Sequence, residues 1–324
     1  MTIDIINLQI IIWQEKNMSK IITFDELEDY YQFLRLMDAS FGWNPSPEYI
    51  TKRRKDKRYK YPFGFCLMKG KTLAGFVGVM DIPVKTIDGK IEKIGGIHCV
   101  ATYPIFSRQG IAKELFDIVH NHFQKLGYRF SFLFTSKSLV AHSLYEKLGY
   151  QDFTPTYKIF RAYKIFPKKK KQVAKKKNKK IKVNHELIQE IYNRAMRNRT
   201  GFAARNKNWS KAIAQVKGID PSKIFVERDG YAFVDTDPDV SYIMEFIAEN
   251  PNAYLKILDK IKRIHNPVLI DAFVGDKKLI KIYKEQGFAF RKSTYFSFMY
   301  KLFSDVSFEQ VFGDNFYLSA LDTF

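Results

Sequence analysis

Cysteine is scarce in this chain, and long apolar runs are missing. The 324 residues include only Cys66 and Cys99, which excludes a disulfide framework and a zinc site built from four thiolates. Two thiols fit a reducing compartment, so we expect a cytoplasmic protein. No apolar run reaches the 18 residues that a membrane-spanning helix needs. The six histidines are scattered and no pair shares a helix face, so we expect no bound metal.

Apolar and aromatic residues, in contrast, are plentiful. Hydrophobic residues make up 46% of the chain and aromatic residues 16%, including 29 Phe and 19 Tyr. A chain of this composition can bury enough apolar surface to offset the entropy lost on folding, which excludes a largely disordered protein. At roughly 150 residues per domain, the length predicts two domains.

The net charge of +20 is concentrated in two strips. Residues 168–182, "KKKKQVAKKKNKKIK", hold ten Lys and no acid, and residues 51–60, "TKRRKDKRYK", contribute +6. Subtraction, 20 − 10 − 6, leaves +4 for the remainder. Each strip has two interpretations: a solvated segment of a Lys-rich protein, or a contact for a polyanion such as nucleic acid.

The Lys run cannot pack into a core, so it predicts the division of the chain. We expect a first domain over residues 18–165, a linker over 166–182 and a second domain over 183–324. Residues 1–17 lack the basic start and the cleavage site of a signal peptide and are expected to form an extension, either a strand or an unstructured leader. Met18 could also be the start of the protein.

The first half begins with a helix and three strands. Apolar residues at spacings of three and four predict an amphipathic helix over 24–38. Strands are predicted over 62–70, 71–90 and 91–103, with a hairpin turn at Asp88-Gly89. Three consecutive strands at this spacing indicate an antiparallel meander.

A strand, a turn and a helix follow, and their junction indicates an anion site. Pro104 ends the strand and Gly110 opens a helix with apolar residues at spacings of three and four. A glycine at a helix start lets a ligand approach the free N–H groups there, where the helix dipole favours negative charge. Ser107 and Arg108 add a hydroxyl and a guanidinium suited to phosphate.

The turn and a second motif together resemble the GNAT acetyltransferase superfamily. The coenzyme A loop of that family, Gln/Arg-x-x-Gly-x-Gly/Ala, is similar to the segment from Ser107 to Ala112, with Ser107 in place of the first Gln/Arg. The second family motif is similar to the segment from Ser138 to Tyr150, with Ser138 where Asn is usual. Tyr145 of this motif lies 35 positions after Gly110 (145 − 110).

The second half contains a weaker copy of the same pattern. The segment "IYKEQGFAFR" at 282–291 repeats "LYEKLGYQDF" at 144–153, which aligns Tyr283 with Tyr145. A strand over 240–249, a helix over 250–264 and a strand over 267–275 are predicted before it, in the order of the first half. This copy lacks the Gly-x-Ala turn, so we expect it to bind no coenzyme.

An active first half followed by a second half without coenzyme resembles the Eis-type (enhanced intracellular survival) acetyltransferases. The segments 95–112 and 192–209 are similar to the corresponding segments of that subgroup, whose third domain has no room here. In that subgroup the terminal carboxylate, often on Phe, enters the active site, and this sequence ends with Phe324.

The resemblance implies the fold class, the reaction and the site residues. The fold class is α/β (α+β): tandem GNAT folds, each a mixed, mainly antiparallel sheet flanked by helices, the second copy degenerate. The reaction is N-acetyl transfer from acetyl-CoA to the amine of a small molecule or protein by direct attack, without a metal. Tyr145 is the implied acid for the thiolate, and the N–H of Val100 is the implied partner of the thioester carbonyl. The implied coenzyme-binding residues are Val100, Ala101, Thr102, Ser107, Arg108, Gln109, Gly110, Ile111, Ala112 and Ser138.

Two groups compete for the role of base. His98 precedes Val100 by two residues and shares its strand face, and an unperturbed imidazole titrates near neutral pH. The Phe324 carboxylate is the rival, and the two could act together.

Two further functions also fit the sequence. The first is a nucleic-acid-associated acetyltransferase that is recruited through the basic strips 51–60 and 168–182. The second is a pseudoenzyme that binds coenzyme A only, which the departure at Ser107 allows. A homo-oligomer, as in Eis-type relatives, is a further expectation from the resemblance.

Overall fold

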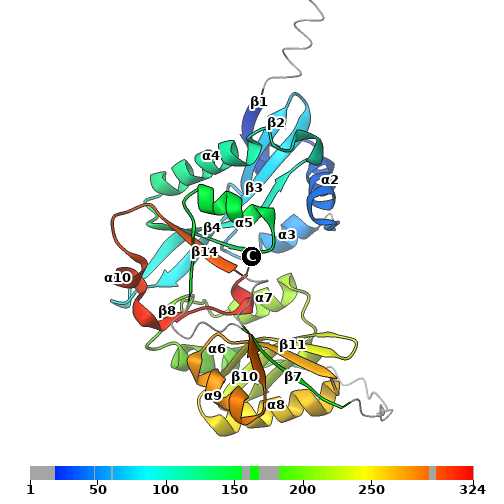
Figure 1. The fold of residues 1–324 in the computed structure, drawn as a ribbon, viewed down its shortest axis with the longest axis vertical. Coiled ribbons are helices and arrows are strands. Elements are labelled where there is room, and N and C mark those ends of the chain that lie inside the picture. Colours follow the sequence, from blue (N-terminus) through cyan, green and yellow to red (C-terminus); the bar gives the residue numbers. More distant parts are fainter. Residues whose placement is uncertain are drawn as a thin grey trace, which may run out of the picture.

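The computed structural model describes residues 19–46, 48–59, 61–154, 161–167, 182–291 and 297–323. The predicted extension 1–17, all of the Lys run except Lys182, and Phe324 lie outside the described residues. Two mixed sheets, each flanked by helices, form the two halves of the molecule (Figure 1). The predicted fold class is therefore confirmed.

The first sheet is built on the predicted meander. Its first five strands are β1 (Ser19–Thr23), β2 (Gly64–Lys69), β3 (Thr72–Lys85), β4 (Ile91–Thr102) and β5 (Phe130–Thr135). Strands β1 to β4 pair antiparallel, and β4 and β5 pair parallel because α4 (Ile111–Lys125) carries the chain back across the sheet. The predicted turn at Asp88-Gly89 connects β3 to β4, with Gly89 at a φ of 80°.

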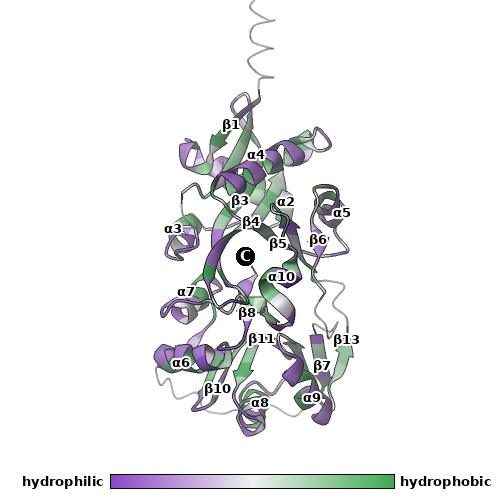
Figure 2. Ribbon diagram, turned by 90° about the vertical axis from the view of Figure 1, so that its left-hand side faces the viewer, coloured by the Kyte–Doolittle hydropathy of each residue, from purple (hydrophilic) through white to green (hydrophobic). Residues whose placement is uncertain are grey.

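Alternating side chains of the first sheet face two different cores. Val77 and Val79 of β3 pack with α4 on one face, and Phe76 and Met80 pack with α2 (Tyr30–Phe41) on the other. The predicted helix 24–38 is split, with a short 3-10 turn (Phe24–Glu26) before α2. Figure 2 shows that β3 and β4 are largely hydrophobic and that the helices carry hydrophilic residues.

The second sheet repeats the order of the first. Its strands in spatial order are β13 (Ala289–Arg291), β7 (Arg161–Ile165), β12 (Leu269–Phe273), β11 (Val240–Ala248), β10 (Gly230–Asp237) and β9 (Ile224–Glu227). Strands β10 and β11 are antiparallel, and β11 and β12 are parallel and joined through α8 (Pro251–His265). This order matches that of β3, β4, α4 and β5.

The two halves exchange one strand each. Strand β7 follows the first half in the chain but pairs with β12 and β13 of the second sheet. Strand β14 (Ser297–Leu302) follows the second half but pairs with β5 and with β6 (Gln151–Asp152) of the first sheet. The predicted first domain includes β7, and no local pattern indicates this exchange. The division of the chain by residue ranges stays a prediction.

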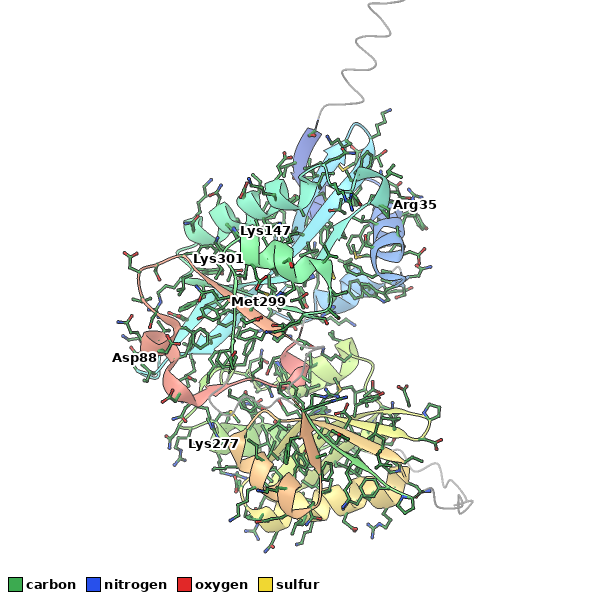
Figure 3. The ribbon with its side chains drawn as sticks, viewed as in Figure 1. Arg35, Asp88, Lys147, Lys277, Met299 and Lys301 are labelled. Carbon is green, nitrogen blue, oxygen red and sulfur yellow. The ribbon has the colours of Figure 1, made fainter. Side chains whose placement is uncertain are left out.

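The exchanged strands make equivalent contacts, which supports the internal repeat. Lys301 of β14 donates from Nζ to the carbonyl of Leu148 after α5 (Val140–Lys147), at 2.5 Å (Figure 3). Lys164 of β7 donates in the same way to Gln286 after α9 (Lys277–Glu285), also at 2.5 Å. Each lysine thus stabilises the C-terminal end of a helix, where carbonyl groups lack intrahelical partners.

An apolar core fills the space between the two sheets. Its aromatic part gathers phenylalanines from three regions that are distant in the sequence: Phe132, Phe202, Phe298, Phe308, Phe312 and Phe316. The helices α6 (His185–Ala195), α7 (Trp209–Val216) and α10 (Phe308–Phe312) contribute to this core. The many Phe residues therefore join the two halves into one packed body.

A buried charge cluster holds the C-terminal segment. Arg205 bonds Glu245 of β11 and Asp322, at 2.7 and 2.9 Å, and all three side chains are at most 3% exposed. The guanidinium also lies 3.4 Å from the ring centroid of Trp209. Burial would raise the pKa of Glu245, but Arg205 outweighs it and the pKa is lowered. The cluster thus fixes residues up to Asp322 against the second sheet.

We predict that Arg205→Met destabilises the protein by about 3–5 kcal/mol, because two buried carboxylates lose their shared cation. The free energy of unfolding in urea measures this loss, and Lys207→Met at an exposed neighbouring position is the control. A loss no larger than that of the control would contradict the role assigned to Arg205.

Candidate active site

The candidate active site begins where β4 and β5 separate. Their parallel pairing ends at Ile97 and Leu133, although both strands continue. Cys99 has a φ of 49°, and the register of β4 on β3 shifts between His98 and Ala101. Cys99 and Val100 therefore form a bulge with no ladder partner on either described neighbouring strand. The bulge bends β4 and opens an edge of backbone groups toward the gap.

A cavity of about 1010 Å³ occupies this gap and reaches the second half of the molecule. The first half contributes residues of β4, β5 and α5, among them Ile97, His98, Cys99, Val100, Leu133, Thr135, Ser136, Ser138 and Tyr145. The second half contributes Arg161, Tyr242, Leu269, Asp271, Arg291 and Thr323. Such a volume suits a small-molecule site at the boundary of two domains.

The turn before α4 provides the predicted anion site. Arg108 and Gly110 both have left-handed backbones, with φ of 63° and 80°. No side chain caps α4 at Gly110, so the first amides of the helix, at Ile111 and Ala112, stay available to a ligand. A Cβ built on Gly110 would meet no heavy atom within 4 Å, so the space beside this residue at the helix start is open. Ser107 and Gln109 are exposed on the same turn. These residues fit a diphosphate.

Ala101 and Thr102 have one backbone edge without a strand partner, where the Thr102 carbonyl accepts a hydrogen bond from the Ser40 hydroxyl at 3.4 Å. On the other edge they pair with Phe76 and Gly75 of β3. Strand β5 has already separated at this point, so no described strand pairs with the free edge. An extended amide-containing chain such as pantetheine could add to this edge as a strand would.

Tyr145 lies on α5 and lines the cavity. Its ring is 6% exposed and packs against Phe116 at a centroid distance of 5.6 Å. Burial raises the pKa of the Tyr145 phenol, so the group keeps its proton at neutral pH. Ser138 lines the same cavity, and its hydroxyl bonds that of Ser136 at 2.7 Å.

His98 also lines the cavity, but its ring is deeply packed. The ring makes edge contacts with Tyr59 and Phe63 and lies so close to Gly78 that a Cβ there would approach within 2.3 Å. Burial lowers the pKa of His98 to about 3, and the charge of Arg53 acts in the same direction. Nε2 has no hydrogen-bond partner among the described residues. The imidazole is therefore neutral and a weak base, contrary to the unperturbed value expected from the sequence.

The second half supplies polar groups that the sequence did not predict. Asp271 of β12 is 5% exposed and bonds Arg161 at 2.6 Å and Arg291 at 2.9 Å. All three residues line the cavity. No local motif marks them, because they meet only after β7 has joined the second sheet.

The C-terminal segment reaches the same cavity at Thr323, the last described residue. Lys217 donates from Nζ to the carbonyl of Thr323 at 2.9 Å. Burial lowers the pKa of Lys217 to about 7, and Arg53 and Arg58 act in the same direction. Nε of Arg53 has no hydrogen-bond partner among the described residues. A buried lysine therefore holds Thr323 at the cavity, and the guanidinium of Arg53 acts on that lysine; Phe324 lies outside the described residues.

The strip 51–60 is not the continuous basic surface that the polyanion interpretation needs. Arg58 is buried in an ion pair with Asp56 at 2.7 Å, and Tyr59 is 3% exposed. Arg53 donates to the Tyr59 hydroxyl at 2.6 Å, and its charge acts on Lys217 of the second half. Part of this strip therefore lies where the two halves meet.

Two further kinds of site were considered among the described residues: a membrane-spanning helix and a metal-binding cluster. No helix among them is both long and apolar enough to cross a membrane. No group of three or more His, Cys, Asp or Glu side chains in this part of the chain is arranged to hold a metal ion.

Comparison with known proteins finds this architecture in several solved structures. A GCN5-related N-acetyltransferase from Kribbella flavida aligns with a TM-score of 0.63 at 12% identity, over 89% of this chain and 71% of that one. Eis1 from Mycobacterium abscessus aligns with a TM-score of 0.57 at 14% identity, over 88% and 73%. A putative acetyltransferase from Pyrococcus horikoshii aligns with a TM-score of 0.52 at 14% identity, over 91% and 92%. At these identities the likeness shows the shared fold.

The sequence itself gives the family of the first half. Residues 24–152 match the model of an acetyltransferase (GNAT) domain. The chain is thus an acyltransferase that contains a GNAT domain. No curated protein matches the chain.

We predict that Gly110→Glu abolishes coenzyme A binding in calorimetry, because a carboxylate would occupy the space in front of the α4 amides. Gly127→Glu is the matched control. Gly127 has a φ of 73° and equally open surroundings but follows the other end of α4, so its backbone strain is comparable. Equal binding by the two variants would contradict the assignment.

Proposed function

We propose that this protein transfers an acetyl group from acetyl-CoA to an amine by direct attack. The observation that carries the proposal is the cavity between β4 and β5, which has Tyr145 on its wall. The uncapped start of α4, the helix that follows β4 in the chain, supports it. Acetyl-CoA supplies the activated acyl group. The residues of the chain bind it, orient the acceptor and handle the protons.

Binding and polarisation are assigned to backbone groups. The amides of Gly110, Ile111 and Ala112, with Arg108, hold the diphosphate, and the free edge of Ala101 and Thr102 holds the pantetheine arm. The N–H of Val100 polarises the thioester carbonyl, which the unpaired bulge in β4 supports. Ser107, Gln109 and Ser138 are assigned peripheral contacts with the coenzyme.

Tyr145 is the proposed acid that donates a proton to the leaving thiolate. Its place on the cavity wall and its raised pKa support this role, because the group stays protonated until it is needed. Because Tyr145 is present and lines the cavity, we favour an active enzyme over a pseudoenzyme that binds coenzyme A only.

The terminal carboxylate of Phe324 is the proposed base, in preference to His98. The pKa of His98, lowered to about 3, makes this imidazole a poor proton acceptor at neutral pH. Thr323, the residue that precedes Phe324, lines the cavity and accepts a hydrogen bond from the buried Lys217, which supports this choice. His98 is then a packing residue that shapes the acceptor side.

The Eis-type arrangement is proposed for the whole chain. The strand exchange, the second sheet and the alignment over 88% of the chain with Eis1 support it. The second half is proposed to bind no coenzyme, because Asn250 caps α8 through its own side chain and Pro251 lacks an N–H.

The acceptor is a small-molecule or protein amine. The burial of Arg58 weakens the case for recruitment to nucleic acid.

We predict that Tyr145→Phe lowers kcat by roughly 10²-fold or more, with little change in coenzyme A affinity, because only a proton donor is lost. Thiol release during a screen of amine acceptors measures turnover. Tyr150→Phe is the control: it removes a buried hydroxyl that bonds Ser131 at 2.7 Å and should lower stability but not kcat. Unchanged turnover in Tyr145→Phe would remove this residue as the acid.

We predict that a short Gly-Ser extension after Phe324 reduces kcat strongly while coenzyme A still binds, because the carboxylate moves away from the cavity. The same extension placed before Met1 is the control. Full activity of the C-terminally extended protein would leave the Phe324 carboxylate without a role.

A further inference from the structure

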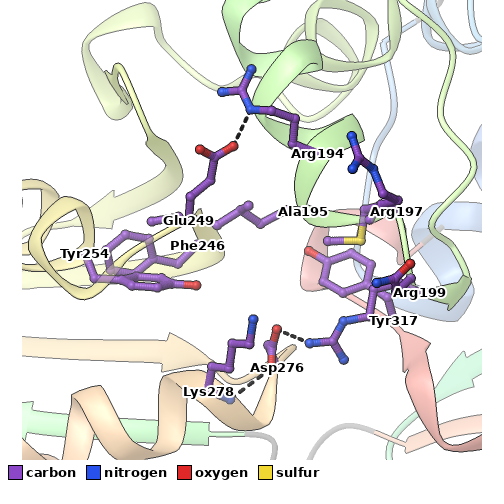
Figure 4. Close-up of a pocket in the computed structure, with 14 residues that line it drawn as sticks. Arg194, Ala195, Arg197, Arg199, Phe246, Glu249, Tyr254, Asp276, Lys278 and Tyr317 are labelled. Atoms are coloured by element: carbon purple, nitrogen blue, oxygen red, sulfur yellow. Dashed lines mark hydrogen bonds and ion pairs between the residues drawn. The ribbon is translucent and has the colours of Figure 1, made fainter.

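The second half contains a cavity of its own, of about 490 Å³. Its walls are formed by the end of β11, the start of α8, the start of α9, and the turn between α6 and β8 (Thr200–Gly201) (Figure 4). None of its lining residues belongs to the cavity between β4 and β5. It is therefore a separate site.

This cavity arises from the internal repeat. The parallel pairing of β11 with β12 ends at Ile243 and Ala272, and Met244 forms a bulge where the register of β11 on β10 shifts. The same two features separate β4 from β5 in the first half. The second copy thus has the same bulge and the same early end of strand pairing beside this cavity. It has lost the open helix start, because Asn250 and Pro251 begin α8.

The lining is charged, with an excess of positive groups. Six charged side chains contribute: Arg194, Arg197, Arg199, Lys278, Glu249 and Asp276. Four cations and two anions give the cavity a net charge of +2 (4 − 2). An excess of this kind inside a concave surface attracts an anion.

Two of the guanidiniums are held in place by the acids. Arg194 pairs with Glu249, and Arg199 pairs with Asp276, whose side chain is only 16% exposed (Figure 4). Asp276 is fixed in turn because it caps α9 through the amide of Lys278 at 2.9 Å. These guanidiniums are therefore oriented before any ligand arrives, which lowers the entropic cost of binding.

The remaining two cations have no acidic partner among the described residues. They are Arg197 and Lys278, and both line the cavity. The carbonyl of Arg197 accepts a hydrogen bond from Nζ of Lys85 at 2.6 Å, so the turn that carries Arg197 is tied to β3 of the first half. Figure 4 shows the Lys278 side chain extending into the cavity between Tyr254 and Asp276.

Aromatic rings form another part of the wall. Phe246 and Tyr254 meet edge to face at 4.9 Å, and both are about 5% exposed. Behind them Tyr283, the counterpart of Tyr145, is fully buried, and its hydroxyl has no hydrogen-bond partner among the described residues. The wall thus offers an apolar surface beside the cations.

We propose that this cavity binds a small organic anion, a phosphate or carboxylate group joined to a flat apolar body. The planar guanidiniums match two oxygens of such a group, Lys278 adds a point charge, and the rings of Phe246 and Tyr254 receive the apolar part. The second half of the chain is then a ligand-binding module in its own right.

Calorimetric titration with phenyl phosphate, benzoate and neutral benzamide tests this proposal. The titrations use the full chain in which Gly110→Glu blocks the diphosphate site of the first half. Phenyl phosphate or benzoate should bind at least tenfold more tightly than benzamide, and the tighter of the two identifies the preferred group. The double variant Arg197→Ala, Lys278→Ala should weaken anion binding at least tenfold. Lys256→Ala, an exposed change on α8 outside the cavity, should not.

Three results would overturn the proposal. They are the absence of heat with either anion at millimolar concentration, binding that the double variant leaves unchanged, and benzamide binding as tight as that of the anions. The double variant Arg197→Gln, Lys278→Gln keeps the proposal testable if the alanine variant unfolds. A negative result in these titrations would not contradict the proposed acetyl transfer, because the two cavities share no residue.

Discussion

The separation of β4 from β5 is the constraint on which the function of this molecule depends. A continuous ladder would bury the backbone of Val100, Ala101 and Thr102 in hydrogen bonds with a neighbouring strand. The bulge at Cys99 bends β4 away instead, and the pairing stops after Ile97. The sheet itself thus leaves these backbone groups without a strand partner, and α4, the helix that returns the chain to β5, begins with amides that no side chain caps.

The reciprocal strand exchange makes the cavity a property of the whole chain. Strand β14 completes the sheet that holds α5 and Tyr145, while β7 carries Arg161 to the opposite wall. Arg205 then fixes the C-terminal segment, up to Asp322, against the second sheet through Glu245 and Asp322. Removal of either half would therefore disturb both sheets, and the second half acts as more than a spacer.

The sequence predicted what depends on local patterns. The meander, the Gly110 turn before α4 and the repeat of Tyr145 at Tyr283 all rest on spacings within short segments. The exchange of β7 and β14 depends on pairs such as Ser297 with Thr135, which no local pattern marks. The burial of His98 and of Arg58 likewise follows from packing between distant segments, so neither the lowered pKa of His98 nor the burial of the Arg58–Asp56 ion pair could be foreseen. The sequence alone shows that Ser107 and Ser138 differ from the family motifs. It does not show where their side chains lie.

Amide hydrogen exchange with and without acetyl-CoA tests the role of the β4 edge most directly, because it reports on individual backbone groups in both copies. We expect acetyl-CoA to slow exchange at the β4 bulge and edge, residues 99–102, and at the start of α4, residues 111–112. We expect no change at the start of α8, residues 252–254. Unchanged exchange along β4, or protection at α8 in its place, would contradict the role of the strand separation.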